Sequence, residues 1–233
     1  MKQAYFVTGT DTGVGKTLVS CALLHAFAAR GLRVAGMKPV AAGCRREGDL
    51  LISEDVELLQ EAGNLQLPLG QVNPYAFEPP LAPHIAAAQV GVEIALPTIV
   101  AAFDALRSQA DVIVVEGVGG FRVPLNARED TADLAALLGL PVILVVGIRL
   151  GCLNHALLTA EAITQRGLTL MGWVANLIDP EMAALEENLT TLKARLPAAC
   201  LGIIPFQKNL NVSAMADGLD VIELTKFDVI RHR

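Results

Sequence analysis

The sequence has few cysteines, and none of them lie at the spacing of a metal or redox site. The four thiols, Cys21, Cys44, Cys152 and Cys200, are widely scattered over 233 residues and form no Cys-x-x-Cys pair. In a chain of this length such scattering argues against a disulfide framework and against zinc or dithiol chemistry. We therefore expect reduced thiols that are mostly buried.

Long hydrophobic runs are also missing. The longest uninterrupted apolar stretch, residues 140–146, is far shorter than a membrane span. At the N-terminus a single lysine precedes only a short apolar strand, which is not the pattern of a signal peptide. We expect a cytoplasmic protein without a membrane partner.

The chain lacks an excess of positive charge as well. Its formal net charge is −6, which gives no support to nucleic-acid binding and indicates dispersed surface charge. Hydrophobic residues make up 53 % of the sequence, enough to fill the core of one α/β domain. Since the sequence also has no repeats and no low-complexity tract, we expect a single domain over residues 1–233.

Continuous apolar runs alternate with helical patterns along the chain. Runs such as residues 112–115 and 142–146 contain no polar alternation, which is typical of parallel strands buried on both faces. Strands are expected at residues 4–8, 33–37, 111–115, 141–146, 170–175 and 200–204. Helices are expected at residues 16–30, 53–61, 94–109, 131–138, 154–166 and 181–195. This order predicts a doubly wound, mostly parallel α/β sheet, with ligands bound beyond the carboxyl ends of the strands.

One long segment fits neither pattern. Residues 63–83 contain five prolines and no clear periodicity. Irregular segments of this length are uncommon in compact domains and are often functional. We interpret this one as a functional insertion or lid.

The motif GTDTGVGKT at residues 9–17 carries the most information about function. It stands between an expected strand and an expected helix, which is the context of a phosphate-binding loop. Gly13 and Gly15 allow the backbone to approach a triphosphate, Lys16 reaches the β- and γ-phosphates, and the Thr17 hydroxyl can ligate Mg²⁺. The first glycine is one residue farther from the Gly-Lys pair than in the usual motif. The chain is predicted to bind a nucleoside triphosphate and to belong to the P-loop NTPase-like folds.

Two charged residues end or follow strands at the sheet edge of the phosphate loop, and a third lies near a helix start. Lys38 comes directly after the second strand, where it points either to the phosphate loop or to solvent. Asp55 near a helix start either complements the helix dipole or ligates Mg²⁺. Glu116 ends the most apolar strand, before the glycine-rich residues 117–120, and a carboxylate at that position typically holds Mg²⁺ in nucleotide sites. The alternative for Glu116 is a satisfied turn carboxylate.

Two further sites stay open on spacing alone. Residues 150–155 begin a helix after the fourth strand; they are either a capped start, with Asn154 near the N-cap, or an anion site for a substrate carboxylate. Asn176 ends the fifth strand. It is either a turn asparagine or a residue whose side-chain amide recognises the edge of a nucleotide base. His84 and His155 have no partner cluster at metal-ligand spacing.

Taken in order from about residue 4 to residue 206, these motifs resemble the dethiobiotin synthetase family. The resemblance includes residues 38–40, 72–77, 82–85, 115–120, 150–155 and 172–176. It implies an ATP-dependent cyclo-ligase of biotin biosynthesis that uses ATP, Mg²⁺ and CO₂ to close a cyclic urea on 7,8-diaminopelargonic acid. The implied route runs through a carbamate, its phosphorylation to a carbamic–phosphoric anhydride, and attack by the second amine. Because phosphorylation activates the carbamate, the protein has only to position the reactants and to stabilise the charge that develops on them.

The resemblance also implies a role for each matching residue. Lys16, Lys38 and Thr12 would be catalytic, and Thr17, Asp55 and Glu116 would hold Mg²⁺. ATP would be bound by Gly13, Val14, Gly15, Lys16, Thr17, Leu18, Asp55, Glu116, Gly117, Val118, Gly119, Asn176, Leu177, Pro205, Phe206 and Gln207. The substrate would be bound by Thr12, Lys38 and Ala42, together with Gly151, Cys152, Leu153 and Asn154 from the other subunit of a homodimer.

Two positions depart from the family pattern. Ala42 stands where the family often has a hydroxyl residue that contacts the substrate, so one hydrogen bond is missing or replaced by water. Asn211 and Val212 stand where an acidic residue is common, which puts a ribose contact in doubt.

The main alternative is a regulatory ATPase switch of the partitioning or division-site type. Such switches have a lysine five positions before the phosphate-loop lysine, and here that position is Asp11. Some also end in a basic amphipathic helix, whereas residues 218–233 mix arginines with Asp220, Glu223 and Asp228. A cobyrinate-type ligase is a closer rival, but such enzymes usually add a glutamine-hydrolysing domain for which this chain has no length.

Overall fold

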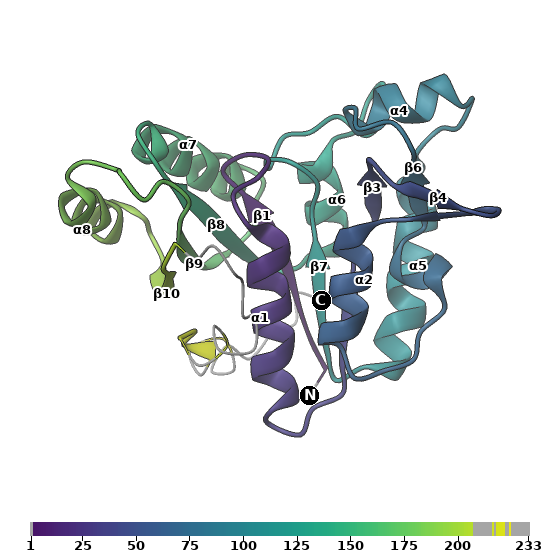
Figure 1. Ribbon diagram of the computed structural model, residues 1–233, viewed down its shortest axis with the longest axis horizontal. Coiled ribbons are helices and arrows are strands. Elements are labelled where there is room, and N and C mark those ends of the chain that lie inside the picture. The colour runs from purple at the N-terminus through teal and green to yellow at the C-terminus, as the bar shows by residue number, and fades with distance from the viewer. Residues whose placement is uncertain (1, 207–215, 217, 222–223, 225–233) are drawn as a thin grey trace.

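A six-stranded parallel sheet forms the centre of the molecule. The computed structural model describes residues 2–206, 216, 218–221 and 224. The strands lie in the order β10-β9-β8-β1-β7-β2, and every neighbouring pair is parallel. The doubly wound α/β fold predicted from the sequence is confirmed (Figure 1).

All six predicted strands and all six predicted helices are present. The strands are β1 (Gln3–Gly9), β2 (Val34–Met37), β7 (Val112–Glu116), β8 (Val142–Ile148), β9 (Leu170–Leu177) and β10 (Ala199–Ile204). The helices are α1 (Lys16–Ala28), α2 (Glu54–Ala62), α5 (Leu96–Gln109), α6 (Thr131–Leu138), α7 (Cys152–Gln165) and α8 (Leu185–Arg195).

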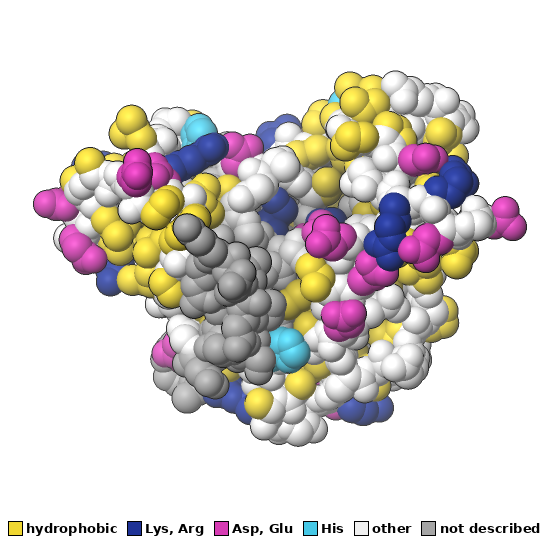
Figure 2. Space-filling model, viewed as in Figure 1, with side chains coloured by type: hydrophobic (Ala, Val, Ile, Leu, Met, Phe, Trp, Pro, Cys, Tyr) yellow, Lys and Arg dark blue, Asp and Glu magenta, His cyan; other side chains and the backbone are white. Residues whose placement is uncertain are grey.

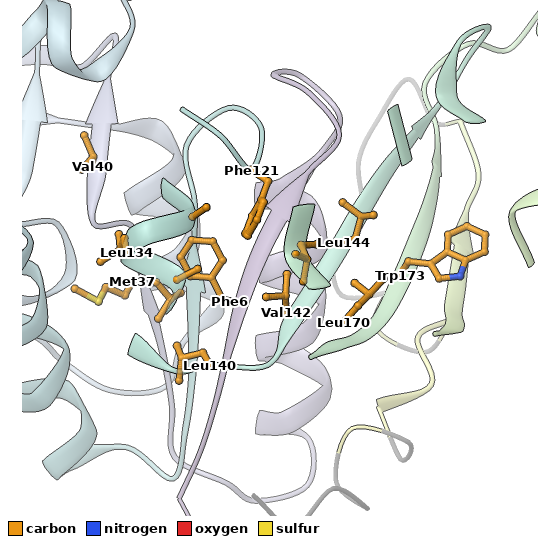
Figure 3. Packing of buried hydrophobic residues seen from close by; sticks show 14 of the residues in the cluster. Phe6, Met37, Val40, Phe121, Leu134, Leu140, Val142, Leu144, Leu170 and Trp173 are labelled. Atoms are coloured by element: carbon orange, nitrogen blue, oxygen red, sulfur yellow. The ribbon is translucent and has the colours of Figure 1, made fainter. Parts of the chain in front are cut away.

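Both faces of the sheet are covered by hydrophobic cores, as the unbroken apolar strands predict. Side chains alternate between the two cores: Tyr5 and Val7 pack with α1 and α2, while Phe6 between them packs on the opposite face with α5, α6 and α7. Figure 3 shows Phe6, Leu134 and Val142 together on that second face. The carboxyl edge of the sheet is thereby left free for a ligand.

Six short elements were not predicted. They are β3 (Val40–Ala42), β4 (Arg45–Glu47), β5 (Leu50–Ile52), α3 (Leu69–Val72), β6 (Tyr75–Phe77) and α4 (Pro83–Gln89). β3 pairs with β6, and β4 pairs with β5 as a hairpin. The segment of residues 63–83 is therefore partly ordered secondary structure, because elements of three or four residues are too short to leave a periodic pattern.

Three predicted helix starts were wrong. α5 begins at Leu96, two residues later than predicted, and the other two errors share one cause. α7 begins at Cys152 and its N-cap is Gly151, in the left-handed region with φ 93°, so Asn154 lies inside the first turn. α8 begins at Leu185, after Ala184, which also adopts a positive φ of 53°. In both cases a left-handed residue sets the start, and hydrophobic spacing does not report backbone handedness.

The close packing of β2 against α1 and α2 gives a test of the fold. A Cβ atom at Gly36 would lie 2.8 Å from Leu59 Cβ and 3.1 Å from Leu24 Cδ1. We expect Gly36→Ala to lower the free energy of unfolding by about 1–3 kcal/mol through overpacking. Gly70→Ala is the control, since a Cβ at Gly70 meets nothing within 4 Å. Urea unfolding measures both, and equal midpoints for the two variants would contradict this packing.

Candidate ATP-binding site

The phosphate loop connects β1 to α1 at the carboxyl edge of the sheet. Gly13 and Gly15 both adopt positive φ angles, 75° and 90°, which only glycine takes up without strain. A Cβ at Gly15 would also lie 2.2 Å from Asn176 Nδ2, so this turn has no room for a side chain. The loop thus presents backbone N–H groups at a helix N-terminus, which suits an anion.

A cavity of about 770 Å³ lies against this loop. Figure 2 shows the surface hollowed between the part that carries α7 and α8 and the part that carries α4. The cavity is lined by Thr12, Gly13, Gly15, Lys16, Thr17, Lys38, Ala42, Asp55, Pro80, Leu81, Ala82, Pro83, Glu116, Val118, Gly119 and Val123. Eleven of these sixteen residues are among the site residues predicted from the sequence.

A polar cluster of four side chains forms the floor of the cavity. Thr17 Oγ1 donates across 2.9 Å to Asp55 Oδ1 and lies 3.0 Å from Glu116 Oε1. Lys38 Nζ donates to Asp55 Oδ2 at 2.8 Å and to Glu116 Oε1 at 2.5 Å. Lys38 is 4 % exposed and Glu116 1 %, so a solvated surface lysine at residue 38 is excluded. Asp55 faces the cluster although it also lies in the first turn of α2.

The two lysines of the site differ in their electrostatic surroundings. Burial, and after it the nearby Lys38 ammonium, lowers the pKa of Lys16 to about 8. Burial also acts to lower the pKa of Lys38, but Glu116 and Asp55 outweigh it and raise that pKa. Lys16 donates only to the carbonyl of Asp11, at 3.0 Å, among the hydrogen bonds of the described residues. Lys16 is therefore the lysine that lacks an anion, and a phosphate group would supply one.

The oxygens of the cluster fit a divalent cation held together with a nucleotide. Glu116 Oε2 is buried and has no hydrogen-bond partner within the part of the chain that the structure describes. One hydroxyl and two carboxylates are a suitable donor set for Mg²⁺, which takes few protein ligands and completes its shell with phosphates and water. No group of three His, Cys, Asp or Glu suited to a metal occurs among the described residues, so the protein alone offers no closed metal cage there.

Several predicted nucleotide-binding residues lie outside the lining of this cavity. Asn176 is buried, and its Nδ2 donates to the carbonyl of Val14 at 2.9 Å, so it braces the phosphate loop from β9. Phe206 is 45 % exposed. The other predicted nucleotide-binding residues that do not line the cavity are Val14, Leu18, Gly117, Leu177 and Pro205. Gln207, Asn211 and Val212 lie outside the described residues.

The predicted carboxylate site also lies apart from the cavity. Gly151, Cys152, Leu153 and Asn154 form the N-terminus of α7, and none of them lines the cavity. Cys152 is buried, whereas Leu150 just before it is 93 % exposed. The structure thus does not bring this helix end together with Lys38 within one chain.

Five cavity residues were not predicted as site residues. Pro80, Leu81, Ala82 and Pro83 come from the proline-rich segment and Val123 from the loop after β7. The proline content did indicate a functional insertion, but it did not indicate which residues face the ligand. No signal in the sequence singled out Val123.

Asp11 occupies the position that separates the site from the switch-type ATPases. Its side chain accepts from Arg149 Nη2 at 2.6 Å and from the N–H of Thr12 at 2.7 Å. The carboxylate is thus used within its own chain to hold the phosphate loop to the segment before α7. No helix in the described part of the chain has the length and apolarity of a membrane span.

Comparisons with known proteins agree with this site. A family described as "AAA domain" matches residues 3–214. The ATP-dependent dethiobiotin synthetase BioD of Nitrosospira multiformis is 54 % identical, covering 96 % of this chain and 97 % of its own length. The protein of the same name from Aromatoleum aromaticum is 55 % identical over 93 % of this chain and 96 % of its own length.

Solved structures give a likeness of fold at much lower identity. The MinC:MinD cell division protein complex of Aquifex aeolicus matches with a TM-score of 0.54 at 15 % identity, over 97 % of this chain and 89 % of that chain. The septum site-determining protein MinD of Pyrococcus horikoshii, complexed with Mg-ADP, matches with the same TM-score and identity, over 97 % and 90 %. These two structures share the architecture, whereas sequence identity above one half lies with the synthetases. The chain therefore belongs to the ATP-dependent dethiobiotin synthetase family.

Proposed function

We propose that this chain is an ATP-dependent cyclo-ligase that converts 7,8-diaminopelargonic acid and CO₂ to dethiobiotin in biotin biosynthesis. The observation that carries the proposal is one cavity that joins the phosphate loop to Lys38, Asp55 and Glu116, in a chain more than half identical to dethiobiotin synthetases. We also propose that residues 1–233 act as one domain in the cytoplasm, without a nucleic-acid or membrane partner.

The two lysines have distinct tasks in this proposal. Lys16, with its lowered pKa and no anionic partner in the described chain, would stabilise the transferring phosphoryl group. Lys38 would stabilise charge on the carbamate that forms when a substrate amine attacks CO₂, with Thr12 beside it at the cavity wall. Phosphorylation turns one carbamate oxygen into a leaving group, and the second amine then displaces phosphate from the carbonyl carbon. Positioned cations that meet such developing charge are an effective source of rate enhancement.

Magnesium would be held by Thr17, Asp55 and Glu116. Support comes from the convergence of their oxygens and from the unpartnered Glu116 Oε2. When bound, the ion neutralises charge on the β- and γ-phosphate oxygens. Gly13, Gly15 and Gly119 would let the backbone approach those phosphates, and Asn176 would recognise adenine while it braces the loop.

We propose a homodimer in which each substrate site uses both subunits. The N–H groups of residues 151–154 would bind the carboxylate of the substrate that lies in the cavity of the partner subunit, since a helix N-terminus favours an anion. Support comes from the separation of this helix end from the cavity of its own chain and from the exposed Leu150 and Leu158 on the same helix region. Ala42 lines the cavity without a polar group, so a water would meet the substrate there.

Coupling of ATP use to both substrates tests the proposed function. With Mg·ATP, diaminopelargonate and bicarbonate, we expect ADP and dethiobiotin in equal amounts, and almost no ADP when either co-substrate is omitted. ATP hydrolysis that proceeds without the substrates would instead support a regulatory switch.

Lys16→Ala should lower turnover on the order of a hundredfold or more, because a transition-state contact is lost.

The metal assignment predicts a changed Mg²⁺ requirement. Glu116→Gln keeps the shape of the side chain and removes its charge, so a higher Mg²⁺ concentration should be needed for half-maximal activity. Glu78→Gln is the control, because Glu78 pairs with the exposed Arg46 and does not line the cavity. An unchanged Mg²⁺ titration for Glu116→Gln would leave Glu116 with a structural role only.

The shared site predicts that two inactive variants complement each other. Lys38→Ala should bind substrate but react poorly, and Asn154→Glu should repel the substrate carboxylate. Among residues 151–154, Asn154 is chosen for the added charge because its side chain is exposed. A charge at Cys152 would instead disturb the core, since Cys152 is 1 % exposed. After random subunit exchange, about a quarter of wild-type activity should return, because half of the dimers are mixed and each holds one intact site. Exchange confirmed by mass spectrometry without recovered activity would place both groups in one chain.

A further inference from the structure

The backbone of Lys38 is held from two sides outside the sheet ladder. β2 ends at Met37, and Pro39 has no N–H to continue the pairing. The N–H of Lys38 instead donates to the carbonyl of Val72 at 2.9 Å. Its carbonyl accepts from Asn73 Nδ2 at 2.6 Å. The N–H and the carbonyl of Lys38 are therefore both fixed by the end of α3.

The side-chain NH₂ group of Asn73 is fully used by two backbone carbonyls. Asn73 is 6 % exposed, and Nδ2 also donates to the carbonyl of Tyr75 at 3.0 Å. An amide NH₂ group has two hydrogens, so both are used on carbonyls. The N–H of Asn73 itself donates to Leu69 at 2.7 Å and fixes the residue to α3. Asn73 thus ties the exit of β2 to α3 and β6 at one point.

We propose that Asn73 is a positioning residue that fixes the base of Lys38 for the carbamate step. The inference rests on the proposed function. A lysine has a flexible four-carbon stem, and in this structure its ammonium is held by Asp55 and Glu116. An ammonium has three N–H donors, and Asp55 and Glu116 take two of them, so the third is left to meet an oxygen of the carbamate. The stem points this donor at the substrate only if the backbone below it is fixed, and Asn73 supplies the carbonyl half of that fixation.

Asn64 offers a matched control at the other end of the same strand. Its Oδ1 accepts from the N–H of Val34 at 2.8 Å, and its Nδ2 donates to the carbonyl of Leu32 at 2.8 Å. Both asparagines make two side-chain-to-backbone bonds; Asn64 uses both at the start of β2, and Asn73 uses one at its exit and the other on β6. Only Asn73 is bonded to the residue that carries the ammonium. A merely structural role would give the two residues similar effects.

The test compares Asn73→Ala and Asn73→Asp with Asn64→Ala in the full-length protein. Asn73→Asp keeps the shape of the side chain but cannot donate to the two carbonyls when it is ionised. For both Asn73 variants we expect kcat to fall by tens-fold to roughly a hundredfold, the loss typical of misplaced catalytic groups. The KM for ATP and the binding of a fluorescent ATP analogue should stay unchanged, because the phosphate loop is intact. Asn64→Ala should melt at a lower temperature and keep its kcat.

Three results would overturn the inference. They are a normal kcat for Asn73→Asp, an equal loss of kcat in Asn64→Ala, or failure of both Asn73 variants to fold, which would make the residue structural. Wild-type protein assayed in parallel distinguishes a failure of the proposed function from a failure of the Asn73 inference alone. If wild type makes no dethiobiotin, the proposed function and this inference both fail. If wild type is active and the Asn73 variants match it, only the inference fails.

Discussion

The buried ion pair between Lys38 and Glu116 is the interaction on which the rest of the site depends. Two charges that are almost fully removed from water need each other, because an isolated buried charge is strongly destabilising. The sheet brings them together: Met37 at the end of β2 is in register with Val115 of β7, so Lys38, which follows β2, comes beside Glu116, which ends β7. Asp55 and Thr17 then join from α2 and α1 and complete a cluster in which each carboxylate has a partner.

This arrangement means that the fold itself positions the charged groups of the proposed phosphoryl-transfer site. Lys16 lies at the phosphate side without an anionic partner in the described chain, and desolvation lowers its pKa. Lys38 lies at the other side, with its charge stabilised by Glu116 and Asp55. Groups that are already oriented need little reorganisation when charge develops on a substrate. The backbone of Lys38 is held in turn by Val72 and Asn73 at the end of α3.

Much of the fold and part of the site could be predicted from the sequence, for physical reasons. Unbroken apolar runs specify strands buried on both faces, and parallel strands end at one edge, so Lys38 and Glu116 were expected near the phosphate loop. The cavity wall from residues 80–83 could not be assigned, because short elements such as β6 leave no periodic signal. The start of α7 was misplaced because it depends on the left-handed Gly151. Asn73 was missed because its role lies in two side-chain-to-backbone bonds, which composition and spacing do not encode.

The central claim is that Lys38 donates to the reacting end of the substrate from a fixed backbone. It is tested most directly by a crystal structure with Mg²⁺, a non-hydrolysable ATP analogue and diaminopelargonate. We expect Lys38 Nζ within hydrogen-bond distance of the reacting end of the substrate, while the backbone bonds of Lys38 to Val72 and Asn73 persist. A ternary complex in which Lys38 Nζ bonds only to Asp55 and Glu116 and lies away from the substrate would contradict it.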